Sequence, residues 1–239
     1  VLKISDSMKA YNERMDKEML EGGKPVIKYY DGVSMNAIWA VPSLGIDPAT
    51  GREIYRKKDG RSTFTYDVND MVICGDNLPK LNGSFSINLG YKGLGFNMTC
   101  IYELGAKMFN QTLIDRVENV DMHYNVDRRV LEGRWQNPGD VVRFRSLKSY
   151  WDPETQTYPR DVQTKATSRF VQKKNELNIS SINISYDFYR YAFVKQIGLE
   201  RLSLAFYMND VAKLSTIKTE RGLAYPFARN YNFSLQMTF

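Results

Sequence analysis

Several aromatic residues between residues 124 and 158 could bind a carbohydrate. Flat aromatic faces match the C–H faces of a sugar ring, and polar neighbours can bond to its hydroxyl groups. Trp151 is the strongest candidate, because the adjoining Asp152 and Pro153 place it beside a turn. The same rings could instead pack a small core of their own segment. The aromatic candidates are Tyr124, Trp135, Tyr150, Trp151 and Tyr158.

Arginines of the same segment could bind acidic groups, since a guanidinium group forms two parallel hydrogen bonds with a carboxylate. They could equally join loops to one another through Asp121, Asp127 or Glu132. The basic candidates are Arg128, Arg129, Arg134, Arg143 and Arg145. We predict a ligand site from Trp135, Tyr150, Trp151, Tyr158, Arg143 and Arg145.

Residue patterns of enzymes and metal sites are lacking. The sequence has no nucleophile elbow, phosphate-binding loop or HExxH pattern. His123 is the only histidine, and it has no cysteine or carboxylate cluster at ligand spacing. Cys74 and Cys100 have no CxxC spacing, so we expect both thiols to stay free. We therefore expect no catalysis, no cofactor and no metal site.

Composition narrows the class of protein further. The chain has 239 residues, of which 43% are hydrophobic and 13% aromatic, and this is ordinary for a folded protein. No apolar run reaches the roughly 18 residues of a membrane-spanning helix. The net charge of +6 would permit nucleic-acid binding, but the basic residues are scattered among 27 acidic ones and form no continuous run. We therefore expect no nucleic-acid partner.

The elements that must position the candidate residues are predicted to be β-strands. Residues 229–239 alternate without interruption between an apolar and an uncharged polar parity. Such a strand suits a position between lipid and a wet lumen, although a half-buried strand of a soluble sandwich alternates in the same way. The apolar parity holds Tyr231, Phe233, Leu235, Met237 and Phe239.

Other segments repeat this alternation, and the chain is predicted to hold about six strands in all. The regular segments measure about 9 to 12 residues, the length that a tilted strand needs to cross the hydrocarbon layer. Tyr91–Lys92–Gly93 predicts a tight hairpin. Leu177 and Ile179 change parity relative to the residues that follow, which predicts a bulge near Ser180 and Ser181. The additional strands are predicted at 33–41, 82–91, 94–104, 178–188 and 202–208.

Short turns alternate with long connections, as is typical of outer-membrane barrels. If the last strand ends in the periplasm, the long connections 42–80, 105–176 and 209–226 lie outside the cell. The same count places residues 5–32 on the periplasmic side.

The longest connection is predicted to have structure of its own. Residues 110–120 and 126–135 carry apolar residues at helical spacing, so we expect two short helices there. A turn is predicted to follow at residues 137–140.

Five segments, in this order and spacing, resemble the C-terminal part of SusC/RagA-type TonB-dependent outer-membrane transporters of Bacteroidetes. The resemblance extends over essentially the whole chain. The segments are GIDPATGREIY at 45–55, SINLGYKGLGFNMTCIYELGAKMFNQTLIDRVEN at 86–119, YNVDRRVLEGRW at 124–135, KATSRFVQKKNELNISSINISYDF at 165–188 and ERGLAYPFARNYNFSLQMTF at 220–239.

The resemblance implies an all-β fold. Residues 1–239 would be the C-terminal part, with antiparallel strands and long extracellular loops that contain short helices, of a barrel of about 22 strands. The N-terminal plug and the other strands would lie outside this sequence. Phe233, Leu235 and Met237 would face lipid, and Phe239 resembles the terminal aromatic residue that the outer-membrane insertion machinery reads.

The same resemblance implies a nutrient importer. Family members take up glycans or oligosaccharides together with a SusD-like surface lipoprotein, and the TonB–ExbB–ExbD complex drives them through the plug. Some RagA-like branches import peptides, and this alternative stays open. A soluble β-sandwich that binds carbohydrate or mediates adhesion is the alternative from another class. Its exposed apolar rows would aggregate in water, which disfavours it.

Overall fold

The computed structural model describes residues 3–22, 25, 27–119, 127–146, 164–218 and 229–239. The chain divides into two compact units. The loop unit consists of residues 1–78 and 107–173, and the sheet unit consists of residues 79–106 and 174–239. Two of the three boundaries fall within long strands, β7 and β8, so each of these strands begins in one unit and ends in the other.

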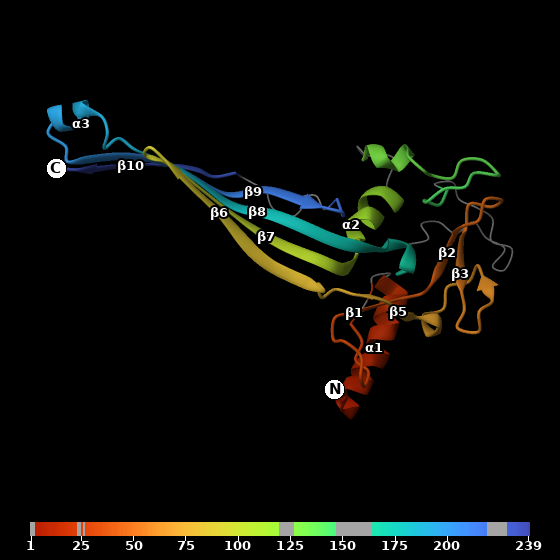
Figure 1. The fold of residues 1–239 in the computed structure, drawn as a ribbon. Coiled ribbons are helices and arrows are strands. Elements are labelled where there is room, and N and C mark those ends of the chain that lie inside the picture. The colour runs from red at the N-terminus through yellow and green to blue at the C-terminus, as the bar shows by residue number, and fades with distance from the viewer. Residues whose placement is uncertain (1–2, 23–24, 26, 120–126, 147–163, 219–228) are drawn as a thin grey trace. The chain divides into compact units, whose positions relative to one another are not determined.

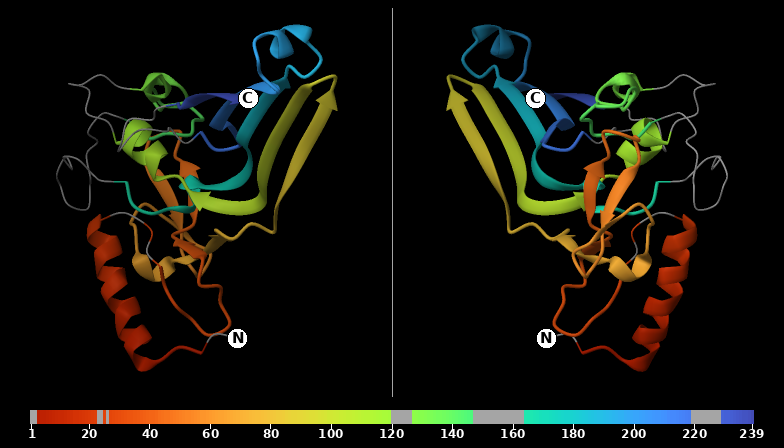
Figure 2. Two further views of the ribbon diagram at one scale, coloured as in Figure 1. Left: turned by 90° about the vertical axis from the view of Figure 1, so that its left-hand side faces the viewer. Right: turned by 90° about the vertical axis from the view of Figure 1, so that its right-hand side faces the viewer.

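The sheet unit is built on a curved sheet of five neighbouring strands, in the order β10-β9-β8-β7-β6 (Figures 1 and 2). Three of its strand pairs, β6–β7, β8–β9 and β9–β10, are antiparallel in the register that the structure defines. Five of the six predicted strands form this sheet. The strands are β6 (Leu81–Tyr91), β7 (Leu94–Phe109), β8 (Val171–Asp187), β9 (Arg201–Ser215) and β10 (Tyr231–Thr238).

The register brings apolar residues of neighbouring strands together. Phe233 pairs with Phe206, which pairs in turn with Ile184 on the next strand. Leu235 pairs with Leu204 in the same way. Residues that face each other across antiparallel strands point to the same side of the sheet, so these pairs form apolar rows on one face.

The predicted hairpin connects β6 to β7. Tyr91 pairs with Leu94, so the turn holds two residues and not the predicted three. Lys92 has a φ of 47° and Gly93 a φ of 94°. A two-residue turn with both φ values positive matches the twist of the flanking strands, and glycine adopts this conformation without steric cost.

The predicted irregularity near Ser180 is confirmed. The register shifts between Ile179, which pairs with Ala212, and Ser181, which pairs with Asn209. Over this interval β9 advances one residue more than β8, so the extra residue lies on β9 and not on β8. Asp210, within this interval, has a φ of 49°, as is common where a bulge disrupts the ladder.

The central strands are longer than predicted, with 16 residues in β7, 17 in β8 and 15 in β9. Charged residues extend them beyond the apolar alternation. Lys174 pairs with Glu103 at 2.8 Å, and Lys213 pairs with Glu176 at 2.6 Å. Ion pairs across strands stabilise a sheet without an apolar pattern, so alternation alone could not detect these extensions.

The loop unit contains two small antiparallel sheets. β1 pairs with β5, and β3 lies between β2 and β4. Residues Val41, Val68, Met71 and Ala166 form a buried cluster in this unit. The strands are β1 (Ala37–Ala40), β2 (Ser43–Ile46), β3 (Glu53–Arg56), β4 (Ser62–Thr63) and β5 (Val72–Asp76).

The prediction of a membrane-length strand at residues 33–41 is wrong. Only Ala37–Ala40 are in a strand, and β1 belongs to the loop unit. Ala40 and Val41 are fully buried there. The alternation in this segment reflects the core of a folded loop region rather than contact with lipid.

The predicted side of residues 5–32 depended on a strand at 33–41, so it no longer follows from the strand count and stays a prediction. Most of the segment is α1 (Asp6–Gly22), a helix that was not predicted. Asn12 holds it to the following segment through two hydrogen bonds with the backbone of Tyr29.

Short helical turns occupy the connections. The helix predicted at 110–120 is confirmed as α2 (Gln111–Leu113) followed by the π-helical turn η2 (Ile114–Glu118). The helix predicted at 126–135 is shorter, a 3₁₀ turn η3 (Arg128–Leu131). The turn at 137–140 is confirmed by a hydrogen bond from Asp140 N to Asn137 O. The other turns are η1 (Val68–Asp70), η4 (Ser168–Phe170) and α3 (Ala192–Gln196).

No helix in the described part of the chain is both long and apolar enough to cross a membrane.

Candidate functional site

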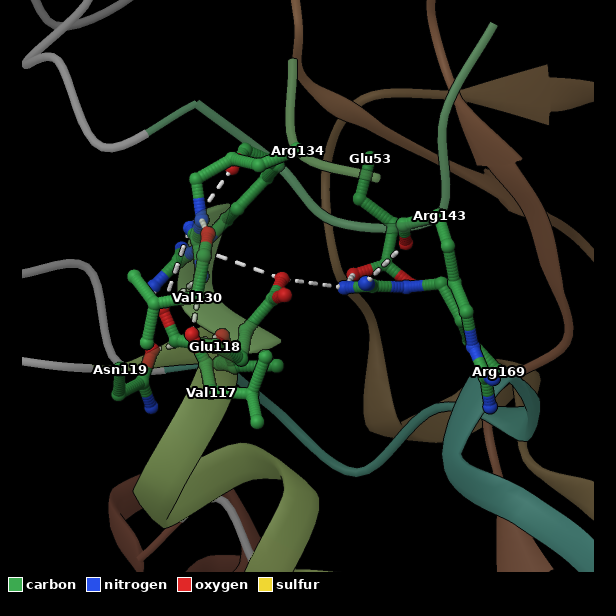
Figure 3. A network of polar contacts seen from close by, with 10 residues as sticks. Glu53, Val117, Glu118, Asn119, Val130, Arg134, Arg143 and Arg169 are labelled. Carbon is green, nitrogen blue, oxygen red and sulfur yellow. Dashed lines mark hydrogen bonds and ion pairs between the residues drawn. The ribbon is translucent and has the colours of Figure 1, made fainter. Parts of the chain in front are cut away.

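A group of buried charges lies in the loop unit (Figure 3). Arg169 Nη2 donates to Glu53 Oε2 at 2.8 Å and to Glu118 Oε1 at 2.7 Å. The side chains of Arg169, Glu53 and Glu118 are only 7%, 5% and 0% exposed. We call these three residues the charged hub. It joins β3, η2 and η4, which are far apart in the sequence.

The hub keeps its arginine charged. Burial by itself lowers the pKa of Arg169, but Glu53 and then Glu118 outweigh this effect and raise the pKa above its usual range. The guanidinium also donates to the backbone carbonyl of Arg143 at 2.8 Å. The guanidinium carbon of Arg169 also lies 4.4 Å from the centroid of the Phe170 ring.

Arg134 ties three backbone segments together beside the hub. Its Nε donates to Val130 O and its Nη1 to Arg145 O, both at 2.9 Å. Its Nη2 donates to the carbonyl of Val117. Burial lowers the pKa of Arg134, whereas the charge of Glu118 opposes this shift. A guanidinium with several donors fixed on carbonyl groups is suited to holding loops in one conformation.

Both predicted ligand-binding arginines adjoin this network. Arg145 Nη2 donates to Asn119 Oδ1 at 2.6 Å, and its Nε lies 3.6 Å from Glu118 Oε1. Arg143 lends only its carbonyl to the hub, while its side chain is exposed over the ring of Phe144. Arg145 is therefore engaged within the protein, and Arg143 presents its side chain to the solvent.

Trp135 is half-buried against the turn at residues 47–51. Its Nε1 donates to Pro48 O at 2.9 Å. Gly51 has a φ of 71°, and a Cβ at this position would lie 2.6 Å from Trp135 Cδ2. Only glycine therefore lets the ring approach so closely. Contact of the indole with a ligand stays a prediction.

The remaining predicted ligand residues, Tyr124, Tyr150, Trp151 and Tyr158, lie outside the described residues. None of the three residues of the charged hub was predicted from the sequence as a site residue. No spacing rule relates positions 53, 118 and 169, so only the tertiary contacts reveal that these side chains meet.

The sheet unit presents a second kind of functional surface, with two contrasting faces. Phe233 and Phe239 are 74% and 83% exposed on the apolar parity, and Leu235 and Met237 are exposed as well. On the other parity, the hydroxyl groups of Ser86 and Thr99 are hydrogen-bonded at 3.0 Å. Asn97 donates to Asn88 one step along the same row. This face is polar but carries no charge in these rows.

A hollow of about 360 Å³ lies on this sheet. Its lining includes Asn88, Asn97, Asn183 and Ser185. The Oδ1 atom of Asn183 is buried without a hydrogen-bond partner among the described residues. The hollow is therefore lined in part by polar amides and hydroxyls, next to one buried acceptor without a partner among the described residues.

Within the described ranges, no three His, Cys, Asp or Glu side chains gather in a way that could hold a metal ion.

Comparisons with known proteins identify one similar sequence and several similar folds. No family model matches the chain. Over 157 residues it is 26% identical to the TonB-dependent receptor P39 of Formosa agariphila, a match that covers 64% of this chain and 14% of that receptor.

The fold is similar to that of RagAB, a peptide importer. In the open-open state the TM-score is 0.62 at 15% identity, over 90% of this chain and 25% of the other. In the closed-closed state the TM-score is 0.61 at 17% identity, over 85% of this chain and 23% of the other. The chain thus spans a quarter or less of the proteins it matches. The resemblance to TonB-dependent receptors and the antiparallel β fold are confirmed.

Proposed function

We propose that residues 1–239 form the C-terminal part of the barrel of an outer-membrane TonB-dependent nutrient importer. The two-faced sheet carries this proposal. Its strands share one apolar face, with rows such as Ile184–Phe206–Phe233, opposite a face of hydrogen-bonded Ser, Thr and Asn. A sheet between lipid and water needs both faces, whereas a soluble sandwich would bury the apolar one.

The polar face would line the lumen. Its neutral side chains hydrogen-bond to one another, as Ser86 does with Thr99, and can exchange these bonds with water or a passing polar solute. In this assignment Phe233, Leu235 and Met237 face lipid, and Phe239 ends the last strand as an assembly signal.

The loop unit would form part of the extracellular entrance. The charged hub and Arg134 hold its loops in one conformation, so that ligand-binding side chains need little ordering on contact. Arg143 is the described ligand candidate that supports this role best, because its guanidinium is exposed beside the hub. Trp135, Tyr150, Trp151 and Tyr158 complete the proposed ligand site, with Arg145 positioning its neighbours.

The substrate class that we propose is a glycan or oligosaccharide, taken up with a SusD-like lipoprotein and energised by TonB–ExbB–ExbD through a plug. The second candidate is a peptide. Similarity to the fold of RagAB, itself a peptide importer, favours this second candidate. We assign no catalytic step to the chain.

Affinity purification of the full-length receptor from its native outer membrane tests the proposal. We expect a SusD-like lipoprotein to co-purify in detergent, and the recovered complex can then be titrated with oligosaccharides and with peptides by calorimetry. Binding of oligosaccharides but not peptides would support the first candidate, and the reverse would support the second. A protein that fractionates as soluble would contradict the importer and favour the sandwich.

A further inference from the structure

The three-stranded sheet of the loop unit has one covered face and one open face, and β3 is its central strand (Figure 1). Glu53 belongs to the charged hub, and Tyr55 packs against the buried cluster of this unit. Side chains of a strand alternate, so Arg52, Ile54 and Arg56 lie on the opposite side. We call this side the outer face. It consists of Gly45, Arg52, Ile54, Arg56, Ser62 and Phe64.

The centre of the outer face is apolar and uncrowded. Ile54 pairs with Gly45 on β2, where an added Cβ would meet no atom within 4 Å. Phe64 follows β4, and its side chain is 41% exposed. An exposed ring beside small residues leaves room for a flat group to lie against the strands.

Cations border this apolar centre. The guanidinium carbon of Arg52 lies 4.9 Å from the centroid of the Phe64 ring. Arg56, which pairs with Ser62, and Lys58 in the following turn are exposed. Neither Arg56 nor Lys58 forms an ion pair within the described ranges.

The acidic residues of segment 52–64 leave these cations available. They are Glu53, which is turned into the hub, and Asp59. Asp59 Oδ2 accepts hydrogen bonds from Arg61 Nε at 2.8 Å and from Arg61 Nη2 at 2.6 Å. Asp70 accepts from the backbone N–H of Lys58 at 3.0 Å, which leaves the ammonium group of Lys58 available. The outer face therefore presents positive charge beside an exposed ring.

Contacts on the covered side hold the outer face in place. Glu53 lies 2.8 Å from Arg169 in the hub, and the backbone of β3 is paired with β2 on one side and with β4 on the other. A face that is fixed before contact loses little conformational entropy when a ligand binds. Because both edges of β3 are occupied, an extended peptide cannot add a strand to it, and recognition here depends on side chains.

We propose that the outer face binds an acidic oligosaccharide. Carboxylate groups of the sugar units contact Arg56 and Lys58, and the C–H face of one ring lies against Phe64 and Ile54. Charge complementarity selects this occupant over a neutral glycan, and the paired edges of β3 disfavour a peptide. The inference rests on the proposed function, and within it names acidic glycans as the substrate class.

Calorimetric titration of the full-length receptor in detergent tests this inference. The probes are tetragalacturonate, its uncharged methyl ester and tetraglutamate. Loss of one charge-assisted hydrogen bond weakens binding by about tenfold. We expect Arg56→Gln/Lys58→Gln to weaken binding of tetragalacturonate by roughly 100-fold, and either single change by about tenfold. The methyl ester should bind the unmodified receptor more weakly than tetragalacturonate does, and the double change should leave its affinity unaltered.

Arg14→Gln/Lys17→Gln is the matched control, because it removes an exposed arginine and an exposed lysine from α1 in the same unit. Equal losses in this control and in the Arg56/Lys58 variant would overturn the inference, since net charge alone would then explain them. Tetraglutamate binding as tight as that of tetragalacturonate would contradict the choice of an oligosaccharide.

Failure of this inference and failure of the proposed function give different results. A receptor that enters the outer membrane and binds no tetragalacturonate overturns the inference alone. A receptor that never enters the membrane fraction contradicts the proposed function itself.

Discussion

At the scale of single residues, the charged hub costs free energy to bury, and it also selects one arrangement of the loops in the loop unit. Glu53 and Glu118 both lie within 2.8 Å of Arg169 and away from solvent. Burying such charges costs free energy that their mutual attraction only partly offsets. Removing the central cation therefore leaves two carboxylates buried without their partner. Their free energy is then higher than in either the paired or the exposed state.

Arg169→Met tests this reasoning. We expect the change to destabilise the loop unit by about 3–5 kcal/mol, because both carboxylates lose their cation. Protease susceptibility of residues 44–56 and 110–146 in the detergent-solubilised receptor measures the effect. Arg128→Met is the control. The Arg128 side chain is 93% exposed, and its ion pair with Glu132 is long, at 3.5 Å. Similar protease susceptibility in the two variants would contradict the hub's role.

At the scale of elements, the register of β10 on β9 decides which side chains lie on the apolar face of the sheet. Leu235 and Ser234 are adjacent, yet they point to opposite faces because the side chains of a strand alternate. A register slip of one residue would exchange the faces of the entire strand. The pairing of Leu235 with Leu204 and of Ser234 with Ala205 therefore assigns Leu235 to the apolar face of the sheet and Ser234 to the opposite face.

Arginine substitutions on the two faces test this statement. In the proposed barrel, Leu235→Arg is expected to cost about 2 to 4 kcal/mol, because it would place a charge against hydrocarbon at mid-depth. Ser234→Arg is expected to cost much less, because the lumen is wet. Reversible unfolding of the full-length receptor in vesicles measures both. Equal losses would refute the assignment of the faces.

The β6–β7 turn permits a second test at this scale. A Cβ at Gly93 would lie 2.5 Å from the backbone oxygen of Asp187, and the residue has a φ of 94°. We expect Gly93→Ala to cost more than about 1 kcal/mol, the penalty of the left-handed backbone alone. The measurement is the fraction of receptor that resists heat-induced mobility shift on gels.

Gly90→Ala is the matched control for this turn. Gly90 lies three residues earlier in β6, where an added Cβ meets no atom within 4 Å. The heat resistance of the Gly90→Ala receptor should equal that of the unmodified receptor. A loss as large as that of Gly93→Ala would contradict the steric argument.

At the scale of the whole molecule, the division into two units predicts sidedness. The loop unit follows one end of β7 and precedes β8, whereas α3 joins the other ends of β8 and β9. If the sheet spans the outer membrane, residue 58 is outside and residue 196 is in the periplasm.

Cysteine labelling tests this arrangement in intact cells. Lys58→Cys is expected to react with a membrane-impermeant maleimide directly, and Gln196→Cys only after the outer membrane is permeabilised. The unmodified receptor is the control. Burial raises the pKa of the Cys74 thiol, so little thiolate is present at neutral pH, and Cys100 is buried. Labelling of both new cysteines without permeabilisation would contradict the topology.

Local patterns in the sequence were sufficient to predict several elements of the fold. The strict alternation at 229–239 predicted β10 and its apolar face, and Tyr91–Lys92–Gly93 predicted the hairpin. The parity change at Ile179 predicted the register shift. Period-two alternation and turn chemistry act over a few residues, so they can be recognised without tertiary contacts.

The other features depend on contacts between distant parts of the sequence. Residues 33–41 alternate like a membrane strand, but they bury Ala40 and Val41 in the loop unit, because alternation does not distinguish lipid from a protein core. The ends of β7, β8 and β9 depend on ion pairs such as Lys174–Glu103 across neighbouring strands. The charged hub unites residues 53, 118 and 169. These contacts arise from chain folding over long sequence separations, and no local pattern encodes them.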